Sequence, residues 1–139
     1  MVVEDDTFRR LCRSRDFLAA HLDQRVMLAD AAGEACLSPF HYQRMFARAF
    51  GETPHDFLTR VRLDRAKELL ARDDRPVTEV CLATGYESLG SFSTRFRTLV
   101  GRSPSDYRRA LRKIFPAPAL AQFHFIPSCY LIRHGAQPF

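Results

Sequence analysis

The sequence predicts an all-α protein in which one helical unit occurs twice and a long helix joins the two copies. Apolar residues recur at spacings of three and four over most of the chain, which is the periodicity of amphipathic helices. Prolines, glycines and hydroxyl residues stand where such helices begin and end. A set of residues also repeats at a constant offset of 50. With 139 residues, 46% of them hydrophobic, the chain has the size and composition of one globular domain or two small lobes.

The first predicted helix has an apolar face and a charged face. The apolar face carries Phe8, Leu11, Cys12, Leu18, Ala19 and Leu22, and the other face carries Arg9, Arg10, Arg13 and Asp16. A short, alanine-rich second helix is predicted over residues 28–36. Ser38 and Pro39 then supply a helix cap and a proline at the first helical position, so a third helix begins there. It runs to about Phe50 and stops at Gly51, because glycine suits a left-handed C-terminal cap.

A longer fourth helix begins at Thr53 and Pro54 in the same way. Asp56 lies in its first turn, where a carboxylate complements the helix dipole. The buried stripe of this helix is marked by Leu63, Ala66 and Leu70, and the run over residues 73–76 ends it. At 1.5 Å per residue the helix would be about 27 Å long.

Nine pairs of residues share the offset of 50 and have the same physical role in both copies. They are Ser38 and Ser88, Tyr42 and Phe92, Phe46 and Phe96, Phe50 and Val100, Gly51 and Gly101, Thr53 and Ser103, Pro54 and Pro104, Asp56 and Asp106, and Phe57 and Tyr107. In order, they supply an N-terminal helix cap, an aromatic stripe at i, i+4 spacing, a glycine that ends the helix, and an N-terminal cap that begins the next helix. The chain therefore contains one helical unit twice.

Each copy has the order of a helix-turn-helix motif. In the second copy a short helix is predicted over residues 77–84, Gly85 supplies the turn, and a further helix covers residues 88–100. In such motifs the second helix enters the major groove of DNA. A joining helix of about 27 Å would place two motifs roughly one DNA turn apart. Two adjacent major-groove segments would then be reachable from one face.

The middle of the chain carries the excess of positive charge. Three acids lie in residues 1–6 and one base, Arg133, lies in residues 114–139, which leaves twenty bases and thirteen acids for residues 7–113. Nineteen of the twenty-one bases are arginine. Arginine favours bidentate pairing with phosphate and guanine, although arginine-rich usage can also reflect genome composition. A polyanionic partner is therefore expected.

The sequence predicts a cytoplasmic protein without membrane contact. The four cysteines, Cys12, Cys36, Cys81 and Cys129, are far apart and fit a reduced compartment. The N-terminus is acidic where a signal peptide would be basic. Residues 114–132 carry no formal charge, but the prolines within this stretch argue against a membrane helix.

The run from Leu28 to Arg109 resembles the AraC/XylS family of bacterial transcription regulators. The segments LADAAGEACLSPFHYQRMFARAFGETPHDFL, RVRLDRAKELL and PVTEVCLATGYESLGSFSTRFRTLVGRSPSDYRR carry the resemblance, which covers about 80 of the 139 residues. The two helix-turn-helix motifs occur in order with the linker helix between them, and a Gly-x-Ser/Thr-Pro segment follows the second helix of each motif. The resemblance implies a monomeric seven-helix domain that places one helix of each motif in successive major grooves of double-stranded DNA. It also implies contact with RNA polymerase and a role as an activator.

We expect three segments along the chain. The first helix-turn-helix subdomain with its linker helix would cover residues 7–71, the second residues 72–113, and an apolar, proline-bearing tail residues 114–139. Larger members of the family add an effector domain, so the resemblance here is to stand-alone members without a small-molecule effector site. The tail lies outside the resemblance. It is too apolar for a free tail, and we expect it to pack back on the domain, with contact to another chain as the alternative.

The resemblance places the base-reading face of the first motif on Phe40, His41, Gln43, Arg44 and Arg48. Chemistry supports this placement, because the core stripe of Tyr42, Met45 and Phe46 leaves the intervening polar positions outside. Arginine with guanine and glutamine with adenine are the usual bidentate pairs. Phe40 could instead act as a hydrophobic staple beside the helix cap.

In the second motif the same face falls on Leu89, Gly90, Ser91, Ser93, Thr94 and Arg95. The family often has longer polar side chains here and an arginine near the place of Thr94, whereas Arg95 is displaced by one residue. Such a face can contact thymine methyl groups, phosphates or short-range donors, but has little capacity for bidentate reading. We therefore expect the first motif to carry most of the specificity. The remaining basic residues should touch the DNA backbone or face solvent: Arg97, Arg102, Arg108, Arg109, Arg112 and Lys113.

Other functions fit the sequence less well. No enzyme is expected, because the five histidines, His21, His41, His55, His124 and His134, are scattered and no catalytic or phosphate-loop motif occurs. Cys36, His41 and Cys81 could bind a metal, but both cysteines lie on apolar helix faces where a buried thiol is usual, so neither metal nor cofactor is expected. Two alternatives stay open: a protein-interaction factor that binds RNA polymerase or another regulator with weak DNA binding, and sequence-neutral DNA binding.

Overall fold

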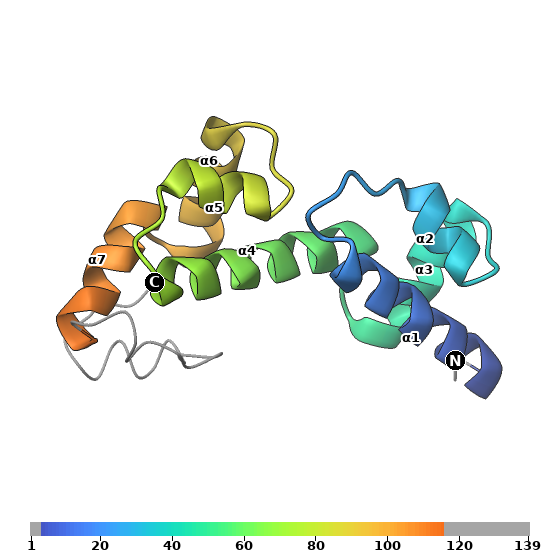
Figure 1. Cartoon of the computed structure of the whole chain (residues 1–139). Helices are drawn as coiled ribbons and strands as arrows, with labels where there is room; N and C mark the ends of the chain where they lie inside the picture. The colour runs from blue at the N-terminus through green and yellow to red at the C-terminus, as the bar shows by residue number, and fades with distance from the viewer. Residues whose placement is uncertain (1–3, 116–139) are drawn as a thin grey trace. The chain divides into compact units, whose positions relative to one another are not determined.

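The computed structural model describes residues 4–115, which form seven helices and no strand. The helices are α1 (Asp5–Ala20), α2 (Leu28–Glu34), α3 (Pro39–Phe50), α4 (Pro54–Arg72), α5 (Val77–Ala83), α6 (Leu89–Val100) and α7 (Pro104–Ile114) (Figure 1). The predicted all-α fold, with two helix-turn-helix motifs and a long helix between them, is confirmed. Residues 116–139, on which the expectation for the tail falls, lie outside the described residues.

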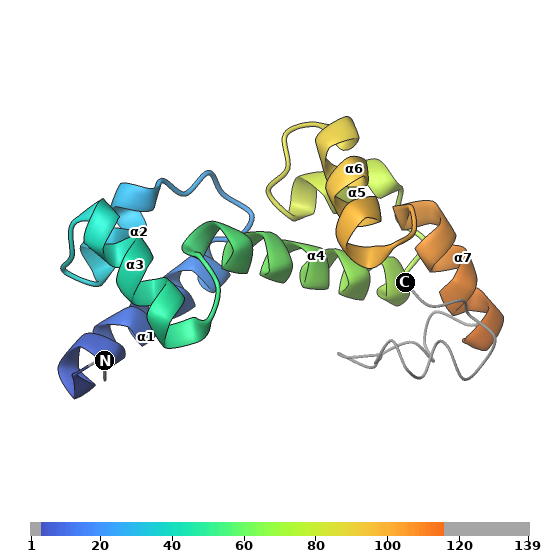
Figure 2. The ribbon, with the colours of Figure 1, turned by 180° about the vertical axis from the view of Figure 1, so that it is seen from behind.

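The described chain forms two compact units that divide within α4, between Arg62 and Leu63. The first unit contains α1, α2, α3 and the start of α4, and the second contains the rest of α4 with α5, α6 and α7 (Figures 1 and 2). α4 is therefore the last helix of the first unit and the first helix of the second. Its buried residues Leu63, Ala66 and Leu70 have the same spacing as the buried residues Leu11, Ser14 and Leu18 of α1. The repeat thus includes the opening helix of each unit.

Hydroxyl side chains cap four helices, as the sequence predicts. In each case the hydroxyl oxygen accepts a hydrogen bond from the backbone N–H three residues later, which satisfies one of the free donors at the helix start. The donors and acceptors are His41 to Ser38 at 3.4 Å, Asp56 to Thr53 at 3.1 Å, Ser91 to Ser88 at 3.1 Å and Asp106 to Ser103 at 3.2 Å. α3 and α6 end at Gly51 and Gly101, whose φ angles of 74° and 89° confirm the left-handed caps.

Each unit has its own core, built around the aromatic stripe of α3 or α6. In the first unit the fully buried ring of Phe46 meets the ring of Phe57 edge to face, at a centroid distance of 5.8 Å. In the second unit Phe96 meets Tyr107 in the same way at 5.6 Å. Among residues 4–115, the other aromatic side chains with no exposed area are Tyr42 and Phe92. The predicted aromatic stripe is confirmed, and it decides which side of each helix faces the core.

The core of the first unit contains a buried pair of hydroxyl groups. Ser14 of α1 donates a hydrogen bond to the carbonyl oxygen of Ala31 at 2.8 Å, and its Oγ shares a hydrogen bond with the Tyr42 hydroxyl at 2.5 Å. Burial raises the pKa of Tyr42, and the hydrogen bond with Ser14 offsets part of this rise. The second unit has Ala66 and Phe92 at the corresponding positions, so its core lacks this pair.

Replacing Ser14 with alanine leaves the buried Tyr42 hydroxyl without this partner. We expect the free energy of unfolding to fall by about 1–3 kcal/mol. The double variant Ser14→Ala/Tyr42→Phe copies the apolar pair of the second unit, so it should lose less than the sum of the two single changes. Urea unfolding of the four proteins measures this difference. Additive losses would show that the two hydroxyl groups are not coupled.

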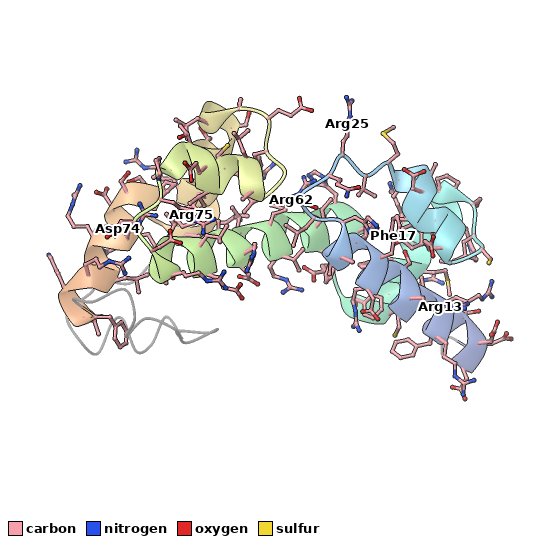
Figure 3. The ribbon with its side chains drawn as sticks, in the orientation of Figure 1. Arg13, Phe17, Arg25, Arg62, Asp74 and Arg75 are labelled. Carbon is pink, nitrogen blue, oxygen red and sulfur yellow. The ribbon has the colours of Figure 1, made fainter. Side chains whose placement is uncertain are left out.

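Two arginines at equivalent positions bind the chain where a long helix ends. Arg62 donates hydrogen bonds to the carbonyl oxygens of Leu22 and Gln24, at 2.8 and 2.9 Å, just after α1 (Figure 3). Carbonyl groups at the end of a helix receive no hydrogen bond from an N–H group of that helix, so side-chain donors stabilise them. Arg112 has the same position in the second unit, at an offset of 50 from Arg62. The nine residue pairs identified from the sequence at this offset do not include Arg62 and Arg112.

Arg112 and Arg108 of α7 bind the end of α4. Arg112 donates to the carbonyl oxygens of Ala71 and Asp73 at 3.1 and 3.2 Å, and Arg108 donates to that of Leu70 at 3.2 Å. The expectation that these two arginines touch the DNA backbone or face solvent is wrong, because α7 packs against α4 and brings both guanidinium groups to its last turn. Burial and the neighbouring Arg112 lower the pKa of Arg108.

Arg112→Met keeps most of the aliphatic stem but removes the donors. The carbonyl groups at the end of α4 then lose their partners, and we expect the free energy of unfolding to fall by about 1–3 kcal/mol. Arg109→Met is the matched control on the same helix, because the Arg109 side chain is 71% exposed. It should change stability by less than about 0.5 kcal/mol. Equal stability of the two variants in urea unfolding would contradict this role of Arg112.

Candidate nucleic-acid interface

Each unit positions one outward helix through a short turn. The turn joins α2 to α3 in the first unit and α5 to α6 in the second. The backbone N–H of Leu37 donates to the carbonyl oxygen of Ala32 at 3.0 Å, and Tyr86 donates to Cys81 in the same way at 3.3 Å. These bonds recur at an offset of 49, whereas the helix caps that follow recur at 50. The second turn therefore has one additional residue, Glu87, before its helix begins.

Both turns contain a residue in the left-handed backbone region. It is Gly85 in the second turn, with φ of 83°, and Cys36 in the first, with φ of 55°. The helix predicted over residues 28–36 therefore ends at Glu34. The expectation that Cys36 lies on a buried helix face is wrong, because this residue is exposed in the turn. Cys81 is buried, as expected, and burial raises the pKa of its thiol.

Glycine at position 36 should suit the first turn better than cysteine. A side chain in the left-handed region costs roughly 1 kcal/mol or more, so Cys36→Gly should raise the free energy of unfolding by up to about 1 kcal/mol, less the entropy that glycine adds to the unfolded chain. The reverse change, Gly85→Ala, should lower it by about 1 kcal/mol. Thermal unfolding of both variants measures these shifts. A lower Tm for Cys36→Gly would contradict this account of the turn.

α3 turns a polar face away from the core of the first unit. Its residues that the sequence singled out for DNA contact are all exposed: Phe40, His41, Gln43, Arg44 and Arg48. Phe40 is 73% exposed, so it does not pack as a hydrophobic staple. The Arg44 guanidinium lies 5.7 Å from the centre of the Phe40 ring, which is within the range of a cation–π contact. An aromatic ring and an arginine therefore lie side by side on the outer face of α3.

α6 has a different outer face. Of the six residues singled out in the second motif, five are exposed and Ser93 is half-buried; the exposed ones are Leu89, Gly90, Ser91, Thr94 and Arg95. A shallow hollow of about 530 Å³ runs along this face, lined by Tyr86, Gly90, Ser91, Thr94, Arg95 and Thr98. Short side chains leave this hollow open. α6 thus presents a concave surface where α3 presents long side chains.

The charges of α3 and α6 set them apart from the other described helices. α3 carries Arg44 and Arg48, α6 carries Arg95 and Arg97, and neither helix contains an acidic residue. Each of the other five helices contains at least one Asp or Glu. On α1, α4 and α7 these acids form ion pairs with arginine or lysine, such as Arg109 with Asp106 at 2.9 Å. Cations without neighbouring carboxylates on the same helix suit contact with a polyanion.

The first turns of the helices also differ in charge between α3 and α6 on one side and α4 and α7 on the other. α4 and α7 have Asp56 and Asp106 in the first turn, where the carboxylate complements the positive end of the helix dipole. α3 and α6 have no acidic residue in the first turn. The N-terminal ends of α3 and α6 therefore keep their attraction for an external anion such as a phosphate group.

Some arginines outside these two helices are exposed, and others are bound to groups of the protein. Arg9, Arg13 and Arg25 are exposed in the first unit, and Figure 3 shows Arg25 projecting from the connection between α1 and α2. Arg75 instead binds Asp73 at 2.8 Å, and its hydrogen bonds lower the pKa of the Asp73 carboxyl to about 2.

Neither a metal cluster nor a membrane-spanning helix is found between residues 4 and 115. No group of three or more His, Cys, Asp or Glu side chains in this range could hold a metal ion. None of the helices in the same range is both long and apolar enough to cross a membrane.

The fold and the two outward helices define a protein of the helix-turn-helix class, and comparison with known proteins gives the family. A family model described as a helix-turn-helix domain matches residues 31–110. The regulatory protein SoxS of Escherichia coli is 34% identical over 91 residues, which is 66% of this chain and 85% of SoxS. The probable transcriptional regulator LumQ of Photobacterium leiognathi is 34% identical over 97 residues, which is 70% of this chain and 39% of LumQ.

Two solved structures show the same fold. The C-terminal domain of AraT, a response regulator from Geobacillus stearothermophilus, is 32% identical with a TM-score of 0.69 and covers 72% of this chain and 84% of its own. The DNA-binding domain of the transcriptional factor AdpA, in complex with a target DNA, is 29% identical with a TM-score of 0.73 and covers 76% and 96%. The chain belongs to the AraC/XylS family of helix-turn-helix transcription regulators. It spans 39% of the length of LumQ and 14% to 32% of several other relatives.

Proposed function

We propose that this protein binds double-stranded DNA in a sequence-specific manner, with α3 and α6 in the major groove, and regulates transcription. The observation that carries the proposal is the charge of these helices: both have two arginines, no acidic residue and an uncompensated N-terminal end. A phosphate backbone would attract them, while the acid-bearing helices would not be favoured in the same place. The AdpA domain, whose structure was solved with its target DNA, supports the proposal.

α3 supplies most of the base discrimination in this proposal. Arg44 and Gln43 are exposed on its outer face, and their side chains match guanine and adenine respectively in the major groove. The ring of Phe40 lies beside the Arg44 guanidinium and restricts its positions, so less entropy is lost when the arginine meets a base. His41 and Arg48 extend the same face and would contact bases or phosphates beside these two.

The regulator would act in the cytoplasm as an activator that contacts RNA polymerase. The support comes from relatives: a 29% identical protein of Bacillus subtilis is named as the transcriptional activator Btr. Activation then depends on where the DNA site lies relative to a promoter. Transcription in vitro from such a promoter, with purified polymerase, tests this part of the proposal.

Selection of duplex DNA from a random pool at physiological salt tests specific binding. The unmodified protein should enrich one motif, and Arg44→Ala should bind that motif about 5- to 150-fold more weakly, as expected for the loss of one bidentate base contact. Arg109→Ala is the matched control, because it removes an exposed arginine from an acid-bearing helix. It should leave the motif and the affinity unchanged.

The salt dependence separates the competing outcomes. Affinity that falls steeply with salt, with a slope of roughly 0.9 for each contacted phosphate, indicates DNA backbone contact. Arg44→Ala that weakens all sequences equally would show sequence-neutral binding. No enrichment by well-folded protein would reject specific DNA binding.

A further inference from the structure

We propose that α6 recognises the 5-methyl group of thymine, and that Gly90 leaves the space into which this group fits. The inference rests on the proposed function, because it assigns a ligand to the second of the two DNA-facing helices. Gly90 would then determine specificity, because the absence of a side chain at this position leaves room for the thymine methyl group. The two reading helices then use different chemistry: α3 forms hydrogen bonds to bases, and α6 forms an apolar contact.

The first observation is the open space at Gly90. This residue is exposed, lines the hollow on α6, and a Cβ atom built on it would meet no atom within 4 Å. The backbone does not require glycine there, because Gly90 lies in the first turn of α6 without a positive φ angle, and alanine favours a helix more than glycine does. Neither strain nor crowding within the protein explains glycine at this position. Close approach by a partner is a recognised use of glycine, and Gly90, unlike Gly33, lines the hollow on α6.

The second observation is the difference between the two copies of the unit. Position 40 of the first copy corresponds to position 90 of the second, at the offset of 50. Phe40 projects from α3 with 73% of its surface exposed, whereas Gly90 leaves a hollow. Likewise Arg44 corresponds to Thr94. Long side chains reach base edges from α3, so α6 must approach its partner more closely to contact it at all.

The third observation concerns the hydroxyl groups on α6, several of which already have partners within the protein. Ser88 donates a hydrogen bond to the Oγ of Ser91 at 2.9 Å, and Thr98 donates to the carbonyl oxygen of Thr94 at 2.9 Å. The hydroxyl hydrogens of Ser88 and Thr98 are therefore used within the helix. The face keeps the hydroxyl groups of Ser91 and Thr94 together with apolar groups, namely the threonine methyls and Leu89, which is 42% exposed.

The chemistry of the major groove selects one ligand for such a face. Thymine carries the only apolar group on the major-groove edges of the four bases, its 5-methyl, and threonine methyls and other apolar side chains contact it. Arg95 at the rim of the hollow carries the charge that would hold the adjacent phosphate. The hollow of about 530 Å³ has room for a methyl group beside these small side chains, and burying one is worth about a fourfold gain in affinity.

The experiment removes the methyl group and nothing else. The full chain is bound to the DNA motif obtained by selection, and the half-site of α6 is identified as the positions that stay specified in Arg44→Ala. Each thymine in that half-site is replaced in turn by deoxyuridine, which lacks only the 5-methyl. We expect affinity to fall about fourfold at one or two positions. Deoxyuridine at α6 positions should have the same effect in Arg44→Ala.

Gly90→Ala tests the space itself. The added methyl should occupy the hollow, so affinity for the thymine site should fall and the difference between thymine and deoxyuridine should disappear. Gly33→Ala is the matched control, because Gly33 also lies exposed in a helix with no atom within 4 Å of a Cβ. Both variants should keep or raise the Tm, since alanine favours helices over glycine. Only Gly90→Ala should alter DNA binding.

The outcomes separate this inference from the proposed function. Specific binding that is weakened by Arg44→Ala but unaffected by deoxyuridine at every α6 position would overturn the inference and leave the proposed function intact. The inference is also rejected when Gly90→Ala retains full discrimination between thymine and deoxyuridine, or when the α6 half-site contains no specified thymine. Failure of the unmodified protein to select any motif would reject the proposed function itself.

Discussion

The edge-to-face contact between Phe46 and Phe57, repeated by Phe96 and Tyr107, is the constraint on which the rest of the structure depends. It joins α3 to α4 and α6 to α7, and the residues on this side of α3 and α6 are fully buried. Because side chains on a helix are separated by about 100° per residue, burying that side directs the intervening positions outward. The glycine caps and the hydroxyl caps then set where each helix ends and the next begins. The outward faces are therefore a consequence of the packing inside.

The two copies share this internal design and differ where it permits variation. Within the core, the pair of Ser14 and Tyr42 in one unit is replaced by apolar residues in the other, and both arrangements satisfy the rule that a buried polar group needs a partner. On the surface no packing requirement acts, and the outer face of α3 has mostly long side chains whereas that of α6 has mostly glycine, serine and threonine. A duplicated scaffold therefore presents two chemically different outward faces.

Arginine has two separate roles in this protein, and net charge does not distinguish them. Arg62, Arg108 and Arg112 donate to backbone carbonyls at helix ends, where they stabilise the fold. Others form ion pairs on acid-bearing helices. The arginines of α3 and α6 have no acidic residue on their own helix. The exposed positive charge of α3 and α6 is thus not offset by an acid on the same helix, and the chain as a whole carries +5.

The sequence by itself determined the seven helices, their caps, the duplication and the aromatic stripe, because these depend on local spacing and on residue types with strong backbone preferences. It also indicated which side of α3 faces outward. It could not show that Cys36 adopts a left-handed turn, since cysteine carries no such signal, nor that Arg108 and Arg112 bind the end of α4. Partners far apart in the chain, and the hollow beside Gly90, exist only once helices pack together. Tertiary structure decided these features because a side chain's role depends on what folding brings beside it.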